Sequence, residues 1–207
     1  MLERIKTFLT DRYNPISLIV YGSYADGTAG LHSDFDALLI YDGPSVHDSS
    51  IVEGITLDVF CYSRNAFCVA FEPKDFVQIW DGIILLDQDG TAKKLQKAVI
   101  SYIGSIPKKS RQEITQSISW CEKMLRRASR GDAEGFYRWH WLLSESLEIY
   151  FDILGEYYYG PKKSLSKLRT ERPSDFAAYE YALECFSFDA LVAWVACLKH
   201  RAEKHVD

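Results

Sequence analysis

Three aspartates and a Gly-Ser pair are the residues of this chain whose types and spacing suit chemistry on phosphates. Gly22 and Ser23 follow an apolar run that reads as a strand, and Asp34 and Asp36 open the next predicted strand. A third carboxylate, Asp58, lies in a later strand-like run. Side chains alternate along a strand, so we expect Asp34 and Asp36 on one face. A glycine lets the backbone come close to a phosphate, and amides at the start of a helix donate to phosphate oxygens.

Carboxylates gathered on one face are costly unless something neutralises them. Two of them about 4 Å apart repel by roughly 4 kcal/mol at an effective dielectric near 20. Either one carboxylate takes up a proton or a cation binds among them. Hard oxygen ligands with no His or Cys nearby favour Mg²⁺ or Mn²⁺ over zinc. The spacing therefore predicts a divalent metal site at Asp34, Asp36 and Asp58.

The full pattern resembles the DNA polymerase beta-like nucleotidyltransferase superfamily, which includes minimal and antibiotic-type members with a C-terminal helical domain. Its shared pattern is Gly-Ser, a short helix, Ser-Asp-x-Asp, and a third Asp on another strand. Here Gly22-Ser23, Ser33 to Asp36, and Asp58 match it. The resemblance implies a transferase of phosphorus-containing groups that uses an NTP, such as ATP, with Mg²⁺ or Mn²⁺. It also implies that Asp34, Asp36 and Asp58 are catalytic and hold metal, and that Gly22 and Ser23 hold the triphosphate.

The same resemblance suggests two candidate site positions in the second half of the chain. The stretch from Glu156 to Lys163 is similar to an aromatic-Tyr-Gly-Pro-Lys segment of small-molecule nucleotidyltransferases, where a lysine reaches toward the triphosphate. Lys163 or Lys162 would match that lysine, and a basic helix start at the surface is the alternative. Glu145 would be an alternative base for the acceptor's proton, although Asp58 is preferred because its position follows from the motif.

The expected reaction is transfer of NMP from an NTP to a hydroxyl of a small, antibiotic-like acceptor bound between two domains. One alternative keeps the chemistry and makes the acceptor a protein or a tRNA end, as in toxin-antitoxin systems. Another is a regulatory module that binds NTP without turnover, but such a module has no need of three metal ligands. The acceptor, the preferred NTP and a homodimer all stay open.

Composition narrows the class of protein further. The formal net charge of -5 argues against general nucleic-acid binding. Five cysteines without close pairing indicate a reduced, cytoplasmic protein. No run of about 18 apolar residues is present, so we expect no membrane span. With 47% hydrophobic residues the chain has ample material for a core.

The pattern of apolar residues predicts an α+β fold, with a mixed sheet flanked by helices and then an α-helical bundle. A boundary near Pro107 gives a catalytic domain over 1–106 and an acceptor-binding helical domain over 107–207. Strands are expected at 16–21, 36–41, 55–62 and 83–86, with a turn-rich stretch over 42–50. Helices are expected at 2–13, 63–70, 74–80 and 91–103, and four more in the second domain. The run from Asp87 to Gly90 reads as a turn into a helix.

Overall fold

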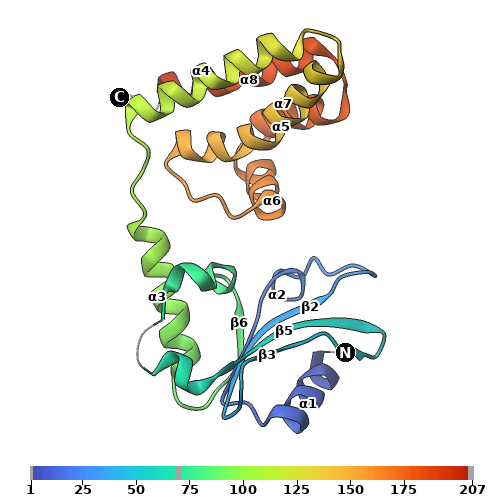
Figure 1. Cartoon of the computed structure of the whole chain (residues 1–207), viewed down its shortest axis with the longest axis vertical. Coiled ribbons are helices and arrows are strands. Elements are labelled where there is room, and N and C mark those ends of the chain that lie inside the picture. Colours follow the sequence, from blue (N-terminus) through green and yellow to red (C-terminus); the bar gives the residue numbers. More distant parts are fainter. Residues whose placement is uncertain (1, 69–70, 205–207) are drawn as a thin grey trace. The chain divides into compact units, whose positions relative to one another are not determined.

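The structure, a computed structural model, describes residues 2–68 and 71–204. The chain divides into two units, Met1–Ile106 and Pro107–Asp207. Figure 1 draws both units, coloured along the sequence. The first unit holds all strands that the structure describes, and the second is helical. This arrangement confirms the expected α+β fold with a mixed sheet followed by a helical region.

The first unit combines six strands with helices at both ends of its sequence. Its elements in chain order are α1 (Leu2–Tyr13), β1 (Ser17–Val20), α2 (Ser23–Asp26), β2 (Phe35–Tyr41), β3 (Val46–Asp48), β4 (Ile51–Val52), β5 (Ile55–Ser63), η1 (Arg64–Phe67), η2 (Pro73–Ile79), β6 (Ile83–Asp87) and α3 (Thr91–Ser105). The 3-10 helices η1 and η2 replace two of the expected helices. The predicted end of the first of these, Ala70, lies outside the described residues.

The sheet is mixed, and β2 is its central strand. The strand order is β3-β5-β2-β1-β6, and β4 pairs with β5 beside this path. The strands β2 and β5 run parallel, whereas β1 is antiparallel to both β2 and β6. The strand β2 is buried on both faces, because Ala37, Leu38, Leu39 and Ile40 are fully buried. Such continuous apolar runs are typical of covered strands.

Each face of the sheet is covered by a separate apolar layer. On one face, α1 packs Ile5 and Leu9 against strand residues that include Val20 and Phe35. On the other face, α3, η1 and η2 pack against Ile19 and Leu38, among others. Figure 1 shows α1 and α3 on opposite sides of the strands. Because side chains alternate, β1, β2, β5 and β6 each send residues into both layers.

The helical unit contains five described helices. They are α4 (Arg111–Ala128), α5 (Ala133–Leu154), α6 (Pro161–Glu171), α7 (Pro173–Glu184) and α8 (Phe188–Lys204). The prediction of four helices was therefore wrong, because it left α6 out. In α6 only Ser164 and Leu168 are buried, so the segment has too few apolar residues to show helical periodicity.

The core of the helical unit is centred on α5, which is bounded by clear end signals. Asp132 caps its start by accepting from the Gly135 amide, and Gly155 ends it in the left-handed conformation. Within the core, Trp194 of α8 stacks on Tyr150 of α5 at a ring distance of 5.6 Å. Full burial of one such aromatic side chain stabilises the unit by about 1.5–3 kcal/mol.

Two features of the first unit bear on the expectations from sequence. The stretch 42–50 was expected to be turns only, yet it contains β3 at the edge of the sheet. The turn from Asp87 to Gly90 does lead into α3, as expected. The Asp87 and Asp89 carboxylates accept from the amides of Ala92, Lys93 and Thr91, which caps that helix.

Candidate active site

The Gly-Ser pair forms a sharp connection between β1 and the short helix α2. Gly22 has φ 65° and ψ -148°, a conformation that side-chain-bearing residues rarely adopt. Its carbonyl accepts from the amides of Ala25 and Asp26, which starts the helical turn. Ser23 is 6% exposed, and Gly27 ends the turn in the left-handed conformation. The strand and helix therefore meet at a residue that exposes bare backbone.

Asp36 and Asp58 are direct neighbours in the sheet. They are register partners on the parallel strands β2 and β5, so both side chains lie on the face covered by α3. Asp36 is half-buried, and 39% of the Asp58 side chain is exposed. The residues that precede them, Phe35 and Leu57, are buried on the opposite face. The backbone register thus places these two residues side by side.

The Gly-Ser turn and the carboxylate pair touch each other. A Cβ atom built at Gly22 would collide with Oδ2 of Asp36 and would lie 3.1 Å from its Cγ. Two features therefore require glycine at this position: the positive φ and the adjacent carboxylate. This contact brings the predicted phosphate-binding residue and a predicted metal ligand into one site.

Tyr21 lies next to both carboxylates and was not singled out from the sequence. Its amide donates to the Asp36 carbonyl at 3.1 Å, and the residue is 8% exposed. Burial raises the pKa of Tyr21, and the negative charges of Asp58 and Asp36 raise it further. Tyr21 therefore stays neutral at physiological pH and forms one wall beside the carboxylate pair.

His47 of β3 is the second residue that sequence reasoning missed. Its Nε2 atom lies 2.6 Å from Oδ1 of Asp58, and its ring stacks on Phe60 with a centroid distance of 4.6 Å. Asp58, Asp36 and Tyr21 lie side by side on β5, on β2 and after β1, and His47, the register partner of Phe60, reaches Asp58 diagonally from β3. Because β3 lies in a stretch expected to be turn-rich, nothing in the sequence placed His47 near Asp58, and the expectation that no His lies near these carboxylates was wrong.

Asp34 immediately precedes β2 and is exposed. The loop before it is closed by Ser33, whose hydroxyl accepts from the Gly30 amide at 2.9 Å. Among the described residues, no group of three or more His, Cys, Asp or Glu side chains is placed to hold a metal ion. The structure thus brings Asp36 and Asp58 together without Asp34 as a third member of one cluster.

Two carboxylates are nevertheless a fitting donor set for Mg²⁺. This ion keeps several waters and is usually bound through one or two carboxylates plus substrate phosphates, not through a closed protein cage. Asp36 and Asp58 supply the hard oxygens, and the backbone of Gly22 lies directly against the Asp36 carboxylate. The site therefore fits a divalent cation that arrives with phosphate.

The predicted residues of the second unit lie on α5 and α6. Glu145 is exposed on α5 and lines a hollow of about 510 Å³ between α4 and α5. The walls of this hollow include Trp120 and Trp141, whose rings meet edge-to-face at 5.5 Å. Lys163 is in the first turn of α6, behind Gly160 and Pro161, and is half-buried.

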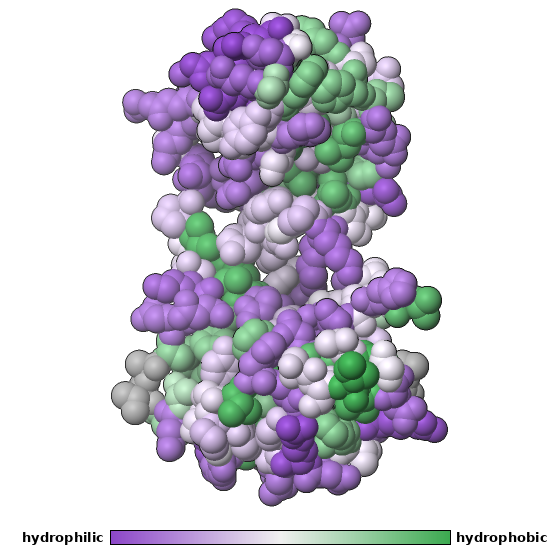
Figure 2. All heavy atoms as spheres, turned by 45° about the vertical axis from the view of Figure 1, so that its right-hand side comes forward, coloured by the Kyte–Doolittle hydropathy of each residue, from purple (hydrophilic) through white to green (hydrophobic). Residues whose placement is uncertain are grey.

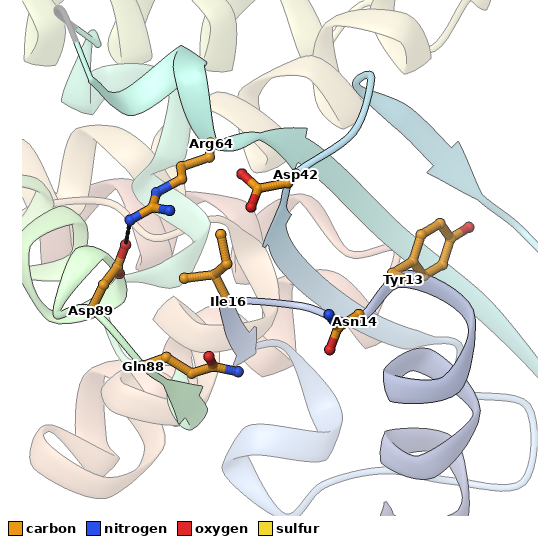
Figure 3. Close-up of a pocket in the computed structure, with 7 residues that line it drawn as sticks. All are labelled: Tyr13, Asn14, Ile16, Asp42, Arg64, Gln88 and Asp89. Carbon is orange, nitrogen blue, oxygen red and sulfur yellow. Dashed lines mark hydrogen bonds and ion pairs between the residues drawn. The ribbon is translucent and has the colours of Figure 1, made fainter.

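A different hollow, of about 450 Å³, lies at the other end of the sheet. Figure 3 shows its lining, which consists of Tyr13, Asn14, Ile16, Asp42, Arg64, Gln88 and Asp89. Arg64 forms an ion pair with Asp89 at 2.9 Å there. Asp42 follows the last residue of β2 and is six residues from Asp36, which corresponds to about 20 Å along a strand. This hollow is therefore separate from the carboxylate pair.

Figure 2 shows mostly hydrophilic residues on the surface of both units, with hydrophobic residues in separate groups. Across residues 2–68 and 71–204, no helix has the length and apolar character needed to cross a membrane.

The sequence model described as a nucleotidyltransferase domain matches residues 2–117, which contain the whole carboxylate site. A solved structure of a nucleotidyltransferase-like protein from Exiguobacterium sibiricum 255-15 is remotely similar, with 12% identity and a TM-score of 0.41. That similarity covers 98% of this chain and 74% of the other. No match was found among curated proteins. Because the family model covers more than half of the sequence, the chain belongs to the nucleotidyltransferase domain family, whose members are transferases of phosphorus-containing groups.

Proposed function

We propose that this protein transfers NMP from an NTP to a hydroxyl group of a small, antibiotic-like acceptor. The observation that carries the proposal is the register pairing of Asp36 and Asp58 on one face of the sheet, with Gly22 against Asp36. Family membership supports the general chemistry of NMP transfer.

In this proposal Asp36 and Asp58 hold Mg²⁺ or Mn²⁺, and Asp34 joins them from the segment before β2. Nucleotidyltransferases generally use an NTP together with a divalent metal, and such a cation would neutralise charge on the phosphates when bound. It would also relieve the repulsion between Asp36 and Asp58, which amounts to roughly 4 kcal/mol for charges about 4 Å apart at an effective dielectric near 20. The carboxylates would otherwise compete for a proton.

The phosphates of the NTP are assigned to the turn after β1. The open backbone at Gly22 and the hydroxyl of Ser23 would contact the triphosphate, and Lys163 would add a positive charge. The positive φ of Gly22 supports this assignment, because the turn needs a residue without a side chain. The assignment of Lys163 rests on the similarity of its surroundings to the aromatic-Tyr-Gly-Pro-Lys segment.

In the proposed reaction one bond to phosphorus forms and one breaks. The acceptor's hydroxyl oxygen attacks the α-phosphorus, and the bond from that phosphorus to the oxygen bridging the β-phosphate breaks. Pyrophosphate leaves, and the hydroxyl proton passes to a carboxylate. We assign this base to Asp58, since it lies in the carboxylate pair, and keep Glu145 as the alternative.

The hollow between α4 and α5 supports a small acceptor bound by the helical unit. Its volume of about 510 Å³ falls in the range of small-molecule sites. Two tryptophans offer flat apolar surface, and Glu113 and Glu145 offer hydrogen-bond acceptors. A protein or tRNA acceptor is the runner-up, and the net charge of -5 does not favour RNA. We also propose a cytoplasmic location, which the free cysteines support.

The test is a mass-shift screen of the purified protein. The protein is incubated with Mg²⁺, each of the four NTPs, and either hydroxylated small molecules or a cell extract. The proposal is supported if a small molecule gains the mass of an NMP with the native protein. The same molecule should gain no mass with the Asp36→Asn protein or the Asp58→Asn protein. If a protein or a tRNA gains this mass instead, the result supports a macromolecular acceptor. The absence of any NMP transfer with all NTPs would contradict both.

A further inference from the structure

His47 is held in a fixed orientation against Asp58 by two contacts. Its Nε2 atom lies 2.6 Å from Oδ1 of Asp58, where the carboxylate accepts the hydrogen bond. Its ring stacks on Phe60, its register partner on β5, with an angle of 24° between the planes. A histidine that is pinned on one side by a ring and on the other by a carboxylate has little freedom to rotate.

The strand that carries His47 is anchored independently of this histidine. The next residue, Asp48, is 4% exposed and lies on the opposite face of the sheet. It accepts from the Tyr13 hydroxyl at 2.7 Å and from the Ser50 amide at 2.9 Å, and Arg12 lies 3.6 Å away. The three-residue strand β3 is therefore fixed to α1, and His47 projects from a rigid edge.

The Asp58 carboxylate has few other constraints. With 39% of its side chain exposed, packing alone does not fix its rotation. Among the described residues, His47 is the one hydrogen-bond donor to this carboxylate, and it uses Oδ1. The second oxygen, Oδ2, is left for other partners.

We propose that His47 is a positioning residue for Asp58. By occupying Oδ1, it fixes the plane of the carboxylate and leaves Oδ2 free of this contact for the role proposed for Asp58. This inference rests on the function proposed above for Asp58. Groups that orient a metal-binding carboxylate are commonly worth a factor of 10–100 in metal affinity or activity. His47 itself neither touches the substrate nor receives the proton.

The chain offers a matched control for the histidine. His140 in the helical unit is also exposed and also stacks on a phenylalanine, Phe186, with an angle of 28° between the rings. Replacing His140 removes the same kind of ring from the same kind of stack. A difference between the two positions therefore reports on the Asp58 contact and not on the loss of an exposed imidazole.

The experiment measures Mn²⁺ binding by electron paramagnetic resonance, with the metal alone and with each α,β-methylene NTP. We expect His47→Ala to weaken Mn²⁺ binding by about 10-fold or more. His47→Gln keeps a side-chain N–H donor and should restore most of the affinity, which a merely structural loss would not allow. His140→Ala should bind as the native protein does. In the Asp58→Asn background, His47→Ala should have little further effect, because the partner is already altered.

Each result decides a separate question. Native affinity in His47→Ala, together with weakened binding in Asp58→Ala, would overturn the positioning role and leave the proposed function in place. Tighter binding in His47→Ala would mean that the imidazole competes with the cation, which would also overturn it. Native affinity in Asp58→Ala would refute the metal role of Asp58 and this inference with it. If His47→Ala does not fold by circular dichroism, His47→Gln and Phe60→Leu, each compared with native protein, decide the matter. Undiminished affinity in Phe60→Leu, or affinity lost in a folded His47→Gln, would overturn the proposal.

Discussion

Gly22 and Asp36 lie so close together that no side chain fits between them. A Cβ atom at position 22 would overlap Oδ2 of Asp36, and Gly22 also has a positive φ of 65°. The turn that is assigned to phosphate and the carboxylate that is assigned to metal are therefore coupled. A change at either residue is transmitted to the other.

The first prediction concerns Gly22→Ala. The new methyl group displaces the Asp36 carboxylate, so we expect kcat to fall by at least 10²-fold and the KM for NTP to rise. Strain at the positive φ adds a loss of about 1–3 kcal/mol in the free energy of unfolding. Steady-state kinetics of pyrophosphate release and urea unfolding measure the two effects.

Gly27→Ala is the matched control for this substitution. Gly27 has a φ of 76°, and a Cβ there meets no atom within 4 Å. It therefore carries a similar backbone strain without the collision. We expect a comparable loss of stability with kcat near the native value. If both variants lost kcat equally, strain in the turn would explain the result and the coupling to Asp36 would be wrong.

The second prediction concerns Asp36→Asn. The variant keeps the shape of the side chain but removes the charge, so Mn²⁺ binding and turnover should fall by at least about 10³-fold. Its stability should be unchanged or higher, because the repulsion with Asp58 is removed. Asp42→Asn is the control, since Asp42 is an exposed carboxylate just past the far end of the same strand. Turnover of Asp36→Asn at the native rate would end the metal assignment.

The local motif made much of this site predictable. The Gly-Ser pair, Asp36 and Asp58 stand at or within apolar strands that the sequence predicts, whereas Asp34 precedes β2, so strand alternation does not place it on the face of Asp36. The register of β2 with β5 places Asp36 beside Asp58. The ends of α1 and α5 also carry the usual signals, at Asn14 and Gly155.

His47 and α6 could not be predicted for physical reasons. The strand β3 has three residues, too few for an alternating pattern, and it exists because β5 pairs with it and Asp48 anchors it. The contact of His47 with Asp58 depends on that pairing, so the sequence alone does not reveal it. The polar composition of α6 masks its helical periodicity, because only Ser164 and Leu168 of this helix are buried.

The third prediction concerns the pH dependence of the helical unit. Asp175 is 6% exposed and pairs with Arg201, with 2.6 Å between Oδ2 and Nε, and the Tyr150 hydroxyl donates to it as well. Burial alone would raise the pKa of Asp175, but the hydrogen bonds from Arg201 and Tyr150 hold it below its ordinary value. A depressed pKa stabilises the fold above the unfolded-state pKa of about 3.9. This contribution is lost as the pH falls below that value.

We therefore expect Asp175→Asn to lose about 3 kcal/mol in the free energy of unfolding at pH 7, because Arg201 is left with an uncompensated charge. The difference from the native protein should shrink as the pH falls from about 4 toward the depressed pKa. Urea unfolding at pH 7, 5, 4 and 3 measures this. Glu180→Gln removes an exposed pair with Arg169 and should change stability by less than 1 kcal/mol. A gap between Asp175→Asn and native protein that stayed constant down to pH 3 would contradict the argument.

The last prediction decides which carboxylate takes the acceptor's proton. Asp58 lies in the pair with Asp36, whereas Glu145 is exposed beside Trp141 in the α4–α5 hollow. If Asp58 is the base, Asp58→Asn should lose both Mn²⁺ binding and turnover, and Glu145→Gln should change kcat by less than about threefold. If Glu145 were the base, Glu145→Gln would lower kcat by roughly 10²–10⁴-fold with NTP affinity unchanged. Calorimetry of NTP binding, run beside the kinetics, separates the two. We expect the first result, because only Asp58 shares a strand register with another predicted metal ligand.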